Sequence, residues 1–375
     1  MTKPNPFIKY ASVAIFSIIL LLYFLGCLTP YISILHFKGF TYIALFFPFL
    51  FIGMLAILLL SLFLFRKYSF FLLLLLLLGY KNIFSTTSFH YPHYFVQQKE
   101  PNTFRLLSWN VDDFVNSDVK CDTVGAPRRM ILDFIKSTNA DILCFQDFSS
   151  AEKNKYVFSN LKYLQDTLHY PYLYISSDDT SKGLSYIYGT VIISRFPITD
   201  SGRFAYARKH LPEHLMYATI NINGHSVRFY NTHLQSMFLH RYGRVPYNNE
   251  QFILDDTAII YTGHRYQKLV YFDSIHVAQA KMAKEKLNEC TLPFIFCADL
   301  NSVPSSYVYQ HISKNLNDVF LQKGSGWGGT YDGLSPTLRI DVVLTSKDLI
   351  ATQYYSPKLQ NASDHYPIVT DIALH

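Results

Sequence analysis

Six short segments of the chain share one arrangement, in which an apolar run ends in, or just before, a polar side chain. Strand ends that bring carboxylates, amides and imidazoles to one edge of a buried scaffold are where chemistry usually takes place. A single segment also fits a turn-forming Asp or Asn, or a structural His, so the prediction depends on all six together. The segments are Leu107–Asn110, Cys144–Asp147, Tyr230–Leu234, Cys297–Asn301, Arg339–Asp341 and Ser363–Pro367, and their candidate site residues are Asn110, Asp147, His233, Asp299, Asn301, Asp341, Asp364 and His365.

The candidate residues offer hard oxygen ligands together with two imidazoles. Carboxylate and amide oxygens suit Mg²⁺ or Mn²⁺ better than Zn²⁺ or copper. Such an ion neutralises the charge of a phosphate group and binds an attacking or a leaving oxygen. We expect His365, or Asp299, to polarise a water molecule for in-line attack on phosphorus. This chemistry needs no Ser or Cys nucleophile, so it predicts inversion at phosphorus without a covalent intermediate.

The elements that must position these residues alternate between strands and helices from Thr103 onwards, with a hairpin signal at Asn223–Gly224. This mixture predicts an α+β domain with helices packed outside two sheets. The connection Gln235–Phe272 is unusually long and is predicted to be a surface insertion. The predicted strands are Phe104–Val111, Asp141–Phe145, Tyr188–Ser194, Met216–Ile222, Val227–Thr232, Phe294–Ala298, Ile340–Thr345 and Ile368–Ile372, and the predicted helices begin at Pro127, Lys153 and Ser274.

Taken together and in this order, the six segments resemble the endonuclease/exonuclease/phosphatase family, which has the fold of pancreatic deoxyribonuclease. The resemblance extends from about Thr103 to Leu374, and its most specific parts are Asp299–Asn301 and Ser363–His365. The stretch Tyr188–Ile198 also looks like a strand and turn of the family. The resemblance implies a four-layer α/β/β/α sandwich of two packed mixed sheets.

The resemblance also implies a role for each candidate residue, on the positions that match the motifs of the family. Asp299 and Asn301 look like the pair that orients the attacking water and holds the phosphate. Asp364 need not contact the adjacent His365, because another carboxylate is able to orient that ring. The implied catalytic residues are His233, Asp299, Asn301, Asp341 and His365, the implied metal ligands are Asp147, Asn110 and Asp364, and the implied substrate-binding residues are Asn110, Asn301 and His233.

Asp147 departs from the pattern, because the family usually has a Glu metal ligand at this position. The Asp side chain is one methylene shorter, so its carboxylate reaches roughly 1.5 Å less far. A metal ion must therefore lie closer to this strand, bind through water, or bind more weakly. The other seven positions follow the family pattern, which argues against a degenerate site.

The N-terminal part of the chain contains three apolar runs. Tyr10–Leu28 and Phe40–Phe65 carry no charge and reach the roughly 20 residues that a membrane-spanning helix needs. The third run, Ser69–Tyr80, is short and extends to Phe84 only by including Lys81 and Asn82. We therefore predict a membrane region with two or three transmembrane helices over residues 1–84, a linker over 85–101 and the globular domain over 102–375.

The basic residues that flank these runs predict an orientation. With three spans, Lys3 and Lys9 lie on the same side of the membrane as Arg66 and Lys67, and the positive-inside rule makes that side cytoplasmic. The globular domain is then extracytoplasmic, in the periplasm of a cell with two membranes. With two spans, the domain is cytoplasmic instead. We favour three spans.

The charge distribution bears on the substrate. The first hundred residues hold seven basic residues and one acidic residue, which leaves 26 of each in the rest of the chain. The globular domain is therefore neutral and lacks the broad basic field of a nucleic-acid binder. We favour a membrane-anchored phosphodiesterase or phosphatase that acts on a lipid headgroup or another small phosphoester. A membrane-tethered endonuclease or exonuclease and a non-enzymatic binding module with the same fold are the alternatives, and the sequence carries no signal of oligomeric state.

Overall fold

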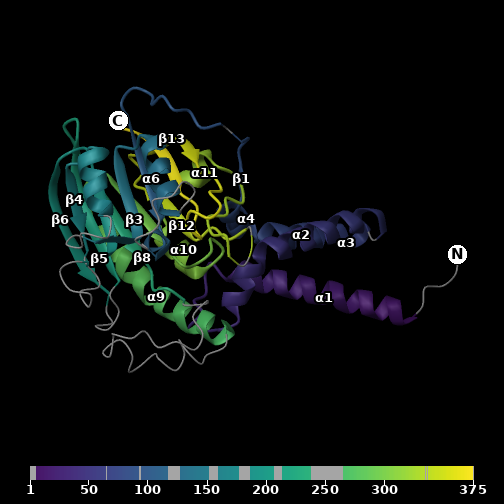
Figure 1. The fold of residues 1–375 in the computed structure, drawn as a ribbon. Helices are drawn as coiled ribbons and strands as arrows, with labels where there is room; N and C mark the ends of the chain where they lie inside the picture. The colour runs from purple at the N-terminus through teal and green to yellow at the C-terminus, as the bar shows by residue number, and fades with distance from the viewer. Residues whose placement is uncertain are drawn as a thin grey trace.

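The computed structural model describes residues 6–64, 66–92, 94–116, 127–151, 159–176, 186–206, 213–237, 265–333, 335 and 337–374. Long apolar helices project from one end of a layered α+β body, and the first of them begins at the end that is farthest from the body (Figure 1). The fold therefore has an elongated N-terminal part and a sandwich that carries the candidate site residues.

The N-terminal part consists of α1 (Pro6–Leu28), α2 (Phe40–Leu64), α3 (Arg66–Leu78) and α4 (Tyr80–Thr86). By length and composition, α1 and α2 could each cross a membrane, and α3 with α4 forms a third candidate that is bent by 56°. The helices α1, α2 and α3 lie side by side, and α3 begins at the end away from the body (Figure 1). Many apolar side chains on their outer faces are exposed, as expected for helices that contact lipid.

Two six-stranded mixed sheets form the centre of the body. The first has the order β10-β12-β9-β8-β7-β6 and the second has the order β13-β14-β2-β3-β5-β4. The strands of the first are β10 (Asn317–Asp318), β12 (Asp341–Thr345), β9 (Phe294–Asp299), β8 (His225–His233), β7 (His214–Ile222) and β6 (Ile198–Ala205). Those of the second are β13 (Ile350–Tyr355), β14 (Ile368–Ala373), β2 (Thr103–Asn110), β3 (Ile142–Ala151), β5 (Tyr186–Ser194) and β4 (Tyr172–Ile175). A small sheet pairs β1 (Ser88–Phe89) with β11 (Ser325–Gly326).

Three apolar cores separate four layers. The middle core packs the two sheets together and includes Phe104, Phe229 and Ile295. A second core packs the outer face of the β2–β3 sheet against α6, and a third packs the outer face of the β8–β9 sheet against α9 and α10. This arrangement confirms the predicted α+β sandwich. The remaining elements are α5 (Asp113–Asn116), α6 (Pro127–Thr138), α7 (Asn160–Lys162), the π-helix η1 (Tyr163–Thr167), α9 (Arg265–Glu289), α10 (Tyr307–Ile312) and α11 (Val319–Lys323).

Several elements differ from their predicted bounds. The helix predicted to begin at Ser274 begins at Arg265. Its first nine residues contain both charged and apolar side chains without a clear apolar period, so the sequence pattern did not reveal them as helical. The predicted insertion Gln235–Phe272 is therefore shorter than expected, and its residues 238–264 lie outside the described residues. The helix predicted from Lys153 is described only from residue 159, where it forms α7 and η1. The strands β4, β6 and β13 were not predicted.

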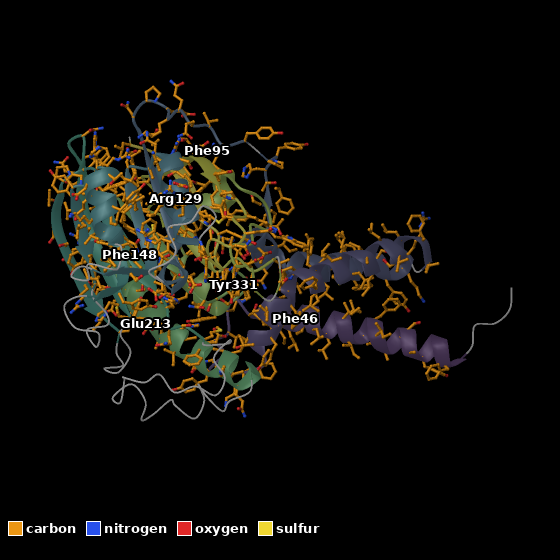
Figure 2. The ribbon with its side chains drawn as sticks, in the orientation of Figure 1. Phe46, Phe95, Arg129, Phe148, Glu213 and Tyr331 are labelled. Atoms are coloured by element: carbon orange, nitrogen blue, oxygen red, sulfur yellow. The ribbon has the colours of Figure 1, made fainter. Side chains whose placement is uncertain are left out.

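The segment predicted to be a linker, residues 85–101, contacts the body along much of its length. The side chain of Arg105 donates hydrogen bonds to the carbonyls of Val96 and Gln97. The ring of Phe95, which is labelled in Figure 2, stacks on Tyr355 with ring centroids 4.8 Å apart. These contacts hold the segment against the body, so it does not act as a free spacer between the two parts.

Candidate active site

The strand order explains why the six predicted segments meet. The strand pairs β2–β3 and β8–β9 are parallel, so each pair brings two carboxyl ends to one edge of its sheet. His233 is paired with Asp299 at that edge, and the antiparallel strand β12 begins there with Asp341, also opposite Asp299. Strand β14 is antiparallel to β2, so the preceding His365 reaches the same edge.

Asp299 lies at the centre of the candidate site and is almost completely buried. Its Oδ1 accepts a hydrogen bond from the backbone N–H of Asn301 at 2.9 Å, and its Oδ2 accepts one from Nδ2 of Asn110 at 3.0 Å. The Nε2 atoms of His233 and His365 lie 3.4 and 3.7 Å from the same Oδ2. One carboxylate therefore links both imidazoles, the amide side chain of Asn110 and the backbone N–H group of Asn301.

His365 is oriented by Asp341 rather than by its neighbour Asp364. The Nδ1 atom of His365 lies 2.9 Å from Oδ2 of Asp341, whereas the closest approach to Asp364 is 3.9 Å. The hydroxyl of Thr330 accepts hydrogen bonds from the backbone N–H groups of Ile340 and Asp341, which fixes the start of β12. Burial lowers the pKa of His365, but the charges of Asp341 and Asp299 outweigh it and raise the pKa to about 10.

His233 forms a second imidazole–carboxylate pair, with Asp147. The His233 Nδ1 atom lies 3.1 Å from Oδ1 of Asp147, which also accepts a 2.7 Å hydrogen bond from the hydroxyl of Tyr188. Burial disfavours the imidazolium, but Asp147 and Asp299 outweigh it and raise the pKa of His233 to about 10. Conversely, burial opposes ionisation of Asp147, but the charge of His233 holds the pKa of this carboxyl well below its usual range. The pair is therefore ionised at neutral pH.

A β-bulge determines where the Asp147 carboxylate points. The register between β3 and β5 shifts between Phe145 and Phe148, and Asp147 has a positive φ of 47°. Behind this bulge, the fully buried amide of Asn231 donates to the carbonyls of Phe145 and Val191. The Asn231 Oδ1 atom accepts a 2.7 Å hydrogen bond from the side chain of Gln146. Asn231 thus bridges the two sheets directly beneath the bulge.

Replacing Asn231 with Leu should therefore destabilise the protein and disturb the position of Asp147. Two carbonyls and the Gln146 amide would lose buried partners, each worth about 1–3 kcal/mol. We expect the free energy of unfolding to fall by at least about 3 kcal/mol. Denaturant unfolding of the purified full chain measures this loss. Asn221→Leu, at the exposed β7–β8 turn, is the control, and an equal effect of both substitutions would contradict the role of the bridge.

The donor set suits a divalent cation. Single ligand atoms of Asp299, Asp341 and His365 lie within 4.8 Å of one another. Burial, followed by the negative charges of Asp364 and Asp147, raises the pKa of Asp112 to about 7, which is the response of a carboxylate crowded by like charges. Burial is likewise the main cause of the raised pKa of Asp364. A cluster of carboxylates that repel one another is the environment that a hard cation such as Mg²⁺ neutralises.

Two residues of this cluster were not among the sequence candidates. Asp112 directly follows the first predicted strand, Phe104–Val111. A carboxylate at the end of an apolar run was therefore the signal that could have identified it. Tyr188 lies on β5 and contacts Asp147 only because of the bulge in β3, which no local pattern indicates. All eight predicted residues lie at the same edge, but among the predicted Asp and His residues, Asp147, His233 and Asp364 are outside the tight group formed by Asp299, Asp341 and His365.

Comparisons with known proteins agree with this arrangement. A family model described as the endonuclease/exonuclease/phosphatase family matches residues 107–365. An endonuclease/exonuclease/phosphatase structure from Beutenbergia cavernae has a TM-score of 0.51 and 18% identity, over 73% of this chain and 72% of that one. The catalytic domain of human Nocturnin with a bound sulfate has a TM-score of 0.50 and 19% identity, over 73% of this chain and 94% of that one. At such low identity, these structures bear on the fold alone.

The N-terminal part has a match of its own. Residues 9–86 match a family model described as a domain of unknown function, DUF8431. No curated protein matches the chain in sequence comparison. The model that matches residues 107–365 covers more than half of the chain and contains all eight predicted site residues. The chain belongs to the endonuclease/exonuclease/phosphatase family.

Proposed function

We propose that this protein is a divalent-metal-dependent phosphoester hydrolase that is anchored in a membrane. The observation that carries the proposal is the convergence of five carboxylates, including that of Asp299, and two imidazoles at one edge of the sandwich. Members of its family are hydrolases that act on phosphoester bonds. A buried acidic centre of this kind would repel an anionic substrate without a cation, so the donor set and the substrate class both favour a bound metal ion.

We assign Asp147, Asn110 and Asp364 as metal-binding residues and add Asp112, whose carboxylate is crowded by two of them. Mg²⁺ or Mn²⁺ bound by these oxygens would neutralise the phosphate charge. Asp147 has both carboxylate oxygens engaged, one by Tyr188 and His233 and the other by Asn110 at 3.3 Å. It is therefore held rigidly, although its side chain is short.

The remaining site residues act on water and on the phosphoryl group. Asp299 is positioned to orient the attacking water and take up its proton, because hydrogen bonds from Asn301 and Asn110 hold the carboxylate in place. His365, kept protonated by Asp341, donates to a phosphoryl oxygen. Protonated His233 donates to the phosphate or to the leaving oxygen. Water attacks phosphorus directly, so the configuration inverts.

A substrate panel on the full chain in detergent tests the function. We expect hydrolysis of bis-para-nitrophenyl phosphate or para-nitrophenyl phosphate with Mg²⁺ or Mn²⁺, and loss of hydrolysis with EDTA. Supercoiled DNA, added to the same panel, tests the nuclease alternative. If neither ester nor DNA is hydrolysed with either metal, while the protein remains folded, the proposed function is wrong and the chain is a binding module.

Asp147→Ala should raise the metal concentration that gives half-maximal activity. A carboxylate that contributes to the metal site is expected to change metal affinity by about 10–100-fold. Titration of activity with Mg²⁺ measures the shift, and Asp200→Ala, on the exposed strand β6, is the control. An unchanged titration would remove Asp147 from the metal site and leave Asp112 and Asp364 as its carboxylates.

We further propose that α1, α2 and the bent pair α3–α4 each cross the membrane, with the body on the extracytoplasmic side. The N-terminus and Arg66 then share the cytoplasmic side, as the positive-inside rule requires. In support, α3 begins at the end of the helices that lies away from the body (Figure 1). A reporter active only in the cytoplasm should be inactive when fused after Gln98. Reporter activity would contradict the three-span topology.

A further inference from the structure

The loop that follows Asn301 packs directly on the apolar helices. In this loop, the buried hydroxyl of Ser305 donates a 2.6 Å hydrogen bond to the carbonyl of Ala44 in α2. The carbonyl of Ser305 accepts a 2.6 Å bond from the hydroxyl of Thr29, at the end of α1. Ser305 and Thr29 are each only about one per cent exposed. The loop is therefore fixed to both helices at Ser305, which follows the candidate active-site residue Asn301 by four positions in the sequence.

A proline explains why the bond to Ala44 is available. Pro48 lies inside α2 and has no N–H group, so the carbonyl four residues earlier, that of Ala44, lacks its helical donor. An unpaired carbonyl in an apolar environment costs several kcal/mol. The Ser305 hydroxyl supplies the missing donor. The body therefore contacts α2 more than one turn after the start of this helix, at a position where the neighbouring residues of α2 are apolar.

A second contact connects the same loop to the first turn of α2. Ser302, adjacent to Asn301, lies 3.5 Å from Oδ1 of Asp273 in α9. The other oxygen of Asp273 accepts a 2.7 Å hydrogen bond from Thr41, the second residue of α2. Asn301 is therefore connected to the start of α2 through Ser302 and Asp273, by two side-chain hydrogen bonds.

The opposite rim of the site is attached to the chain that leaves α4. Strand β1 pairs with β11, and the Ser88 hydroxyl donates to the carbonyl of Gly324 at 2.7 Å. The guanidinium of Arg339, two residues before Asp341, donates a 2.7 Å bond to the carbonyl of Ser85. The loop after Asn301 and the segment before Asp341 are thus both hydrogen-bonded to the ends of the apolar helices that lie next to the body.

Exposed side chains mark the membrane surface at this end of the helices. Tyr31 and Tyr80 are more than half exposed, and the Lys81 ammonium lies 4.5 Å from the centre of the Tyr31 ring. Tyrosines and lysines of this kind are typical of the boundary between the apolar interior and the headgroups. The ring of Tyr331, which is labelled in Figure 2, lies against His365 with ring centroids 4.9 Å apart.

We propose that the substrate is a phosphoester carried by a lipid of the bilayer in which the protein is embedded, an inference that rests on the proposed hydrolase function. The headgroup region is only about 5–7 Å deep on each side of the apolar interior. A site rim fixed to the first turns of α2 lies within reach of that region. The exposed rings of Phe84 in α4 and Phe89 in β1, which contact each other, offer an apolar surface to the lipid chain.

The test compares one headgroup in two physical forms. The full chain is reconstituted into phosphatidylcholine vesicles that also contain phosphatidic acid, phosphatidylglycerol or a phosphatidylinositol phosphate, with Mg²⁺. The soluble counterpart is the short-chain form of the same lipid below its micelle concentration. Because embedding raises the effective concentration of the lipid, we expect its turnover to exceed that of the soluble form by about 100-fold or more. Diluting the lipid with more phosphatidylcholine at constant bulk concentration should lower the rate in proportion.

Each alternative outcome has a definite meaning. Hydrolysis of bis-para-nitrophenyl phosphate without hydrolysis of any embedded lipid would overturn the lipid inference and leave the hydrolase function intact. Equal turnover of the embedded and the short-chain lipid would also overturn it. If soluble and embedded esters both resist hydrolysis, the proposed function itself fails. Substrate vesicles that lack the protein, added from outside, should be cleaved far more slowly than the lipid around it.

A variant separates lipid presentation from folding. In the double variant Thr41→Val/Ser305→Ala, α2 loses its hydrogen bond to the loop and its hydrogen bond to Asp273 of α9, and we expect embedded-lipid turnover to fall about tenfold. Turnover of bis-para-nitrophenyl phosphate should change much less, because no residue of the site is altered. Ser137→Ala, on the exposed face of α6, is the matched control. An equal loss on both substrates would contradict the assignment of these contacts to lipid presentation.

Discussion

Asp299→Asn should reduce the turnover number by about 1,000-fold on any phosphoester that the protein hydrolyses. The substitution preserves the size of the side chain but removes the charge that two imidazoles approach within 4 Å. It also replaces one carboxylate oxygen by an NH₂ group, which cannot accept a hydrogen bond. Either the Asn110 side chain or the backbone N–H of Asn301 therefore loses its acceptor. Steady-state kinetics on bis-para-nitrophenyl phosphate at saturating Mg²⁺ measure the effect.

Asp200→Asn is the matched control for this prediction, because Asp200 pairs with Arg228 at the exposed edge of the same sheet. It should leave the turnover number within about twofold of the original value, as expected for a surface substitution. Circular dichroism and thermal unfolding verify that both variants are folded. If Asp299→Asn retains more than about a tenth of the original turnover, Asp299 does not handle the proton of the attacking water.

Arg339→Leu should lower the free energy of unfolding by about 3–5 kcal/mol, since it removes one partner of a buried ion pair. The guanidinium lies 2.7 Å from Oδ2 of Asp318, and both side chains are at most three per cent exposed. It also packs against the ring of Phe320 at 4.6 Å and bonds to Ser85. Without Arg339, the Asp318 carboxylate stays buried without its cationic partner, and the start of β12 loses its connection to the membrane region.

Two further variants make the Arg339 prediction specific. Arg129→Leu, which removes an exposed pair with Asp133, should change the free energy of unfolding by less than about 1 kcal/mol. The double variant Arg339→Leu/Asp318→Asn should recover part of the loss, because Asn carries no charge and its side-chain oxygen can still accept the hydrogen bond from the backbone N–H of Phe320. Chemical unfolding of the full chain in detergent provides these values. A double variant that is far less stable than Arg339→Leu would show that the charge of Asp318 is stabilised by other groups.

The composition of the site could be predicted to a large extent, because strand ends follow from local apolar patterns. Asn110, His233 and Asp299 each end a strand that is apolar enough to recognise, and parallel pairing brings those ends together. Asp112 escaped prediction because it follows the end of β2, in a turn where three consecutive residues adopt positive φ. Tyr188 escaped because a bulge, rather than a regular register, brings it to Asp147.

The strands and the contacts of the fold likewise include features that could not be predicted from local sequence patterns. Strand β6 has a mostly exposed side-chain pattern, so it lacks the alternation that identifies a half-buried strand. The contacts between the helices and the body were not predictable either. They join residues that are more than two hundred positions apart, such as the hydroxyl of Ser305 with the carbonyl of Ala44 and the hydroxyl of Thr41 with the carboxylate of Asp273. No local pattern carries information about such partners, which depend on the complete tertiary structure.

The bond between Ser305 and the carbonyl of Ala44 has a consequence for how the sequence can change. A relative with a residue other than proline at the position of Pro48 regains the helical N–H donor, so its serine hydroxyl would compete for an acceptor that is already used. A relative that keeps the proline but replaces the serine leaves a carbonyl of the second helix without its donor. The two positions, 257 residues apart, should therefore vary together during evolution, although neither belongs to the active site.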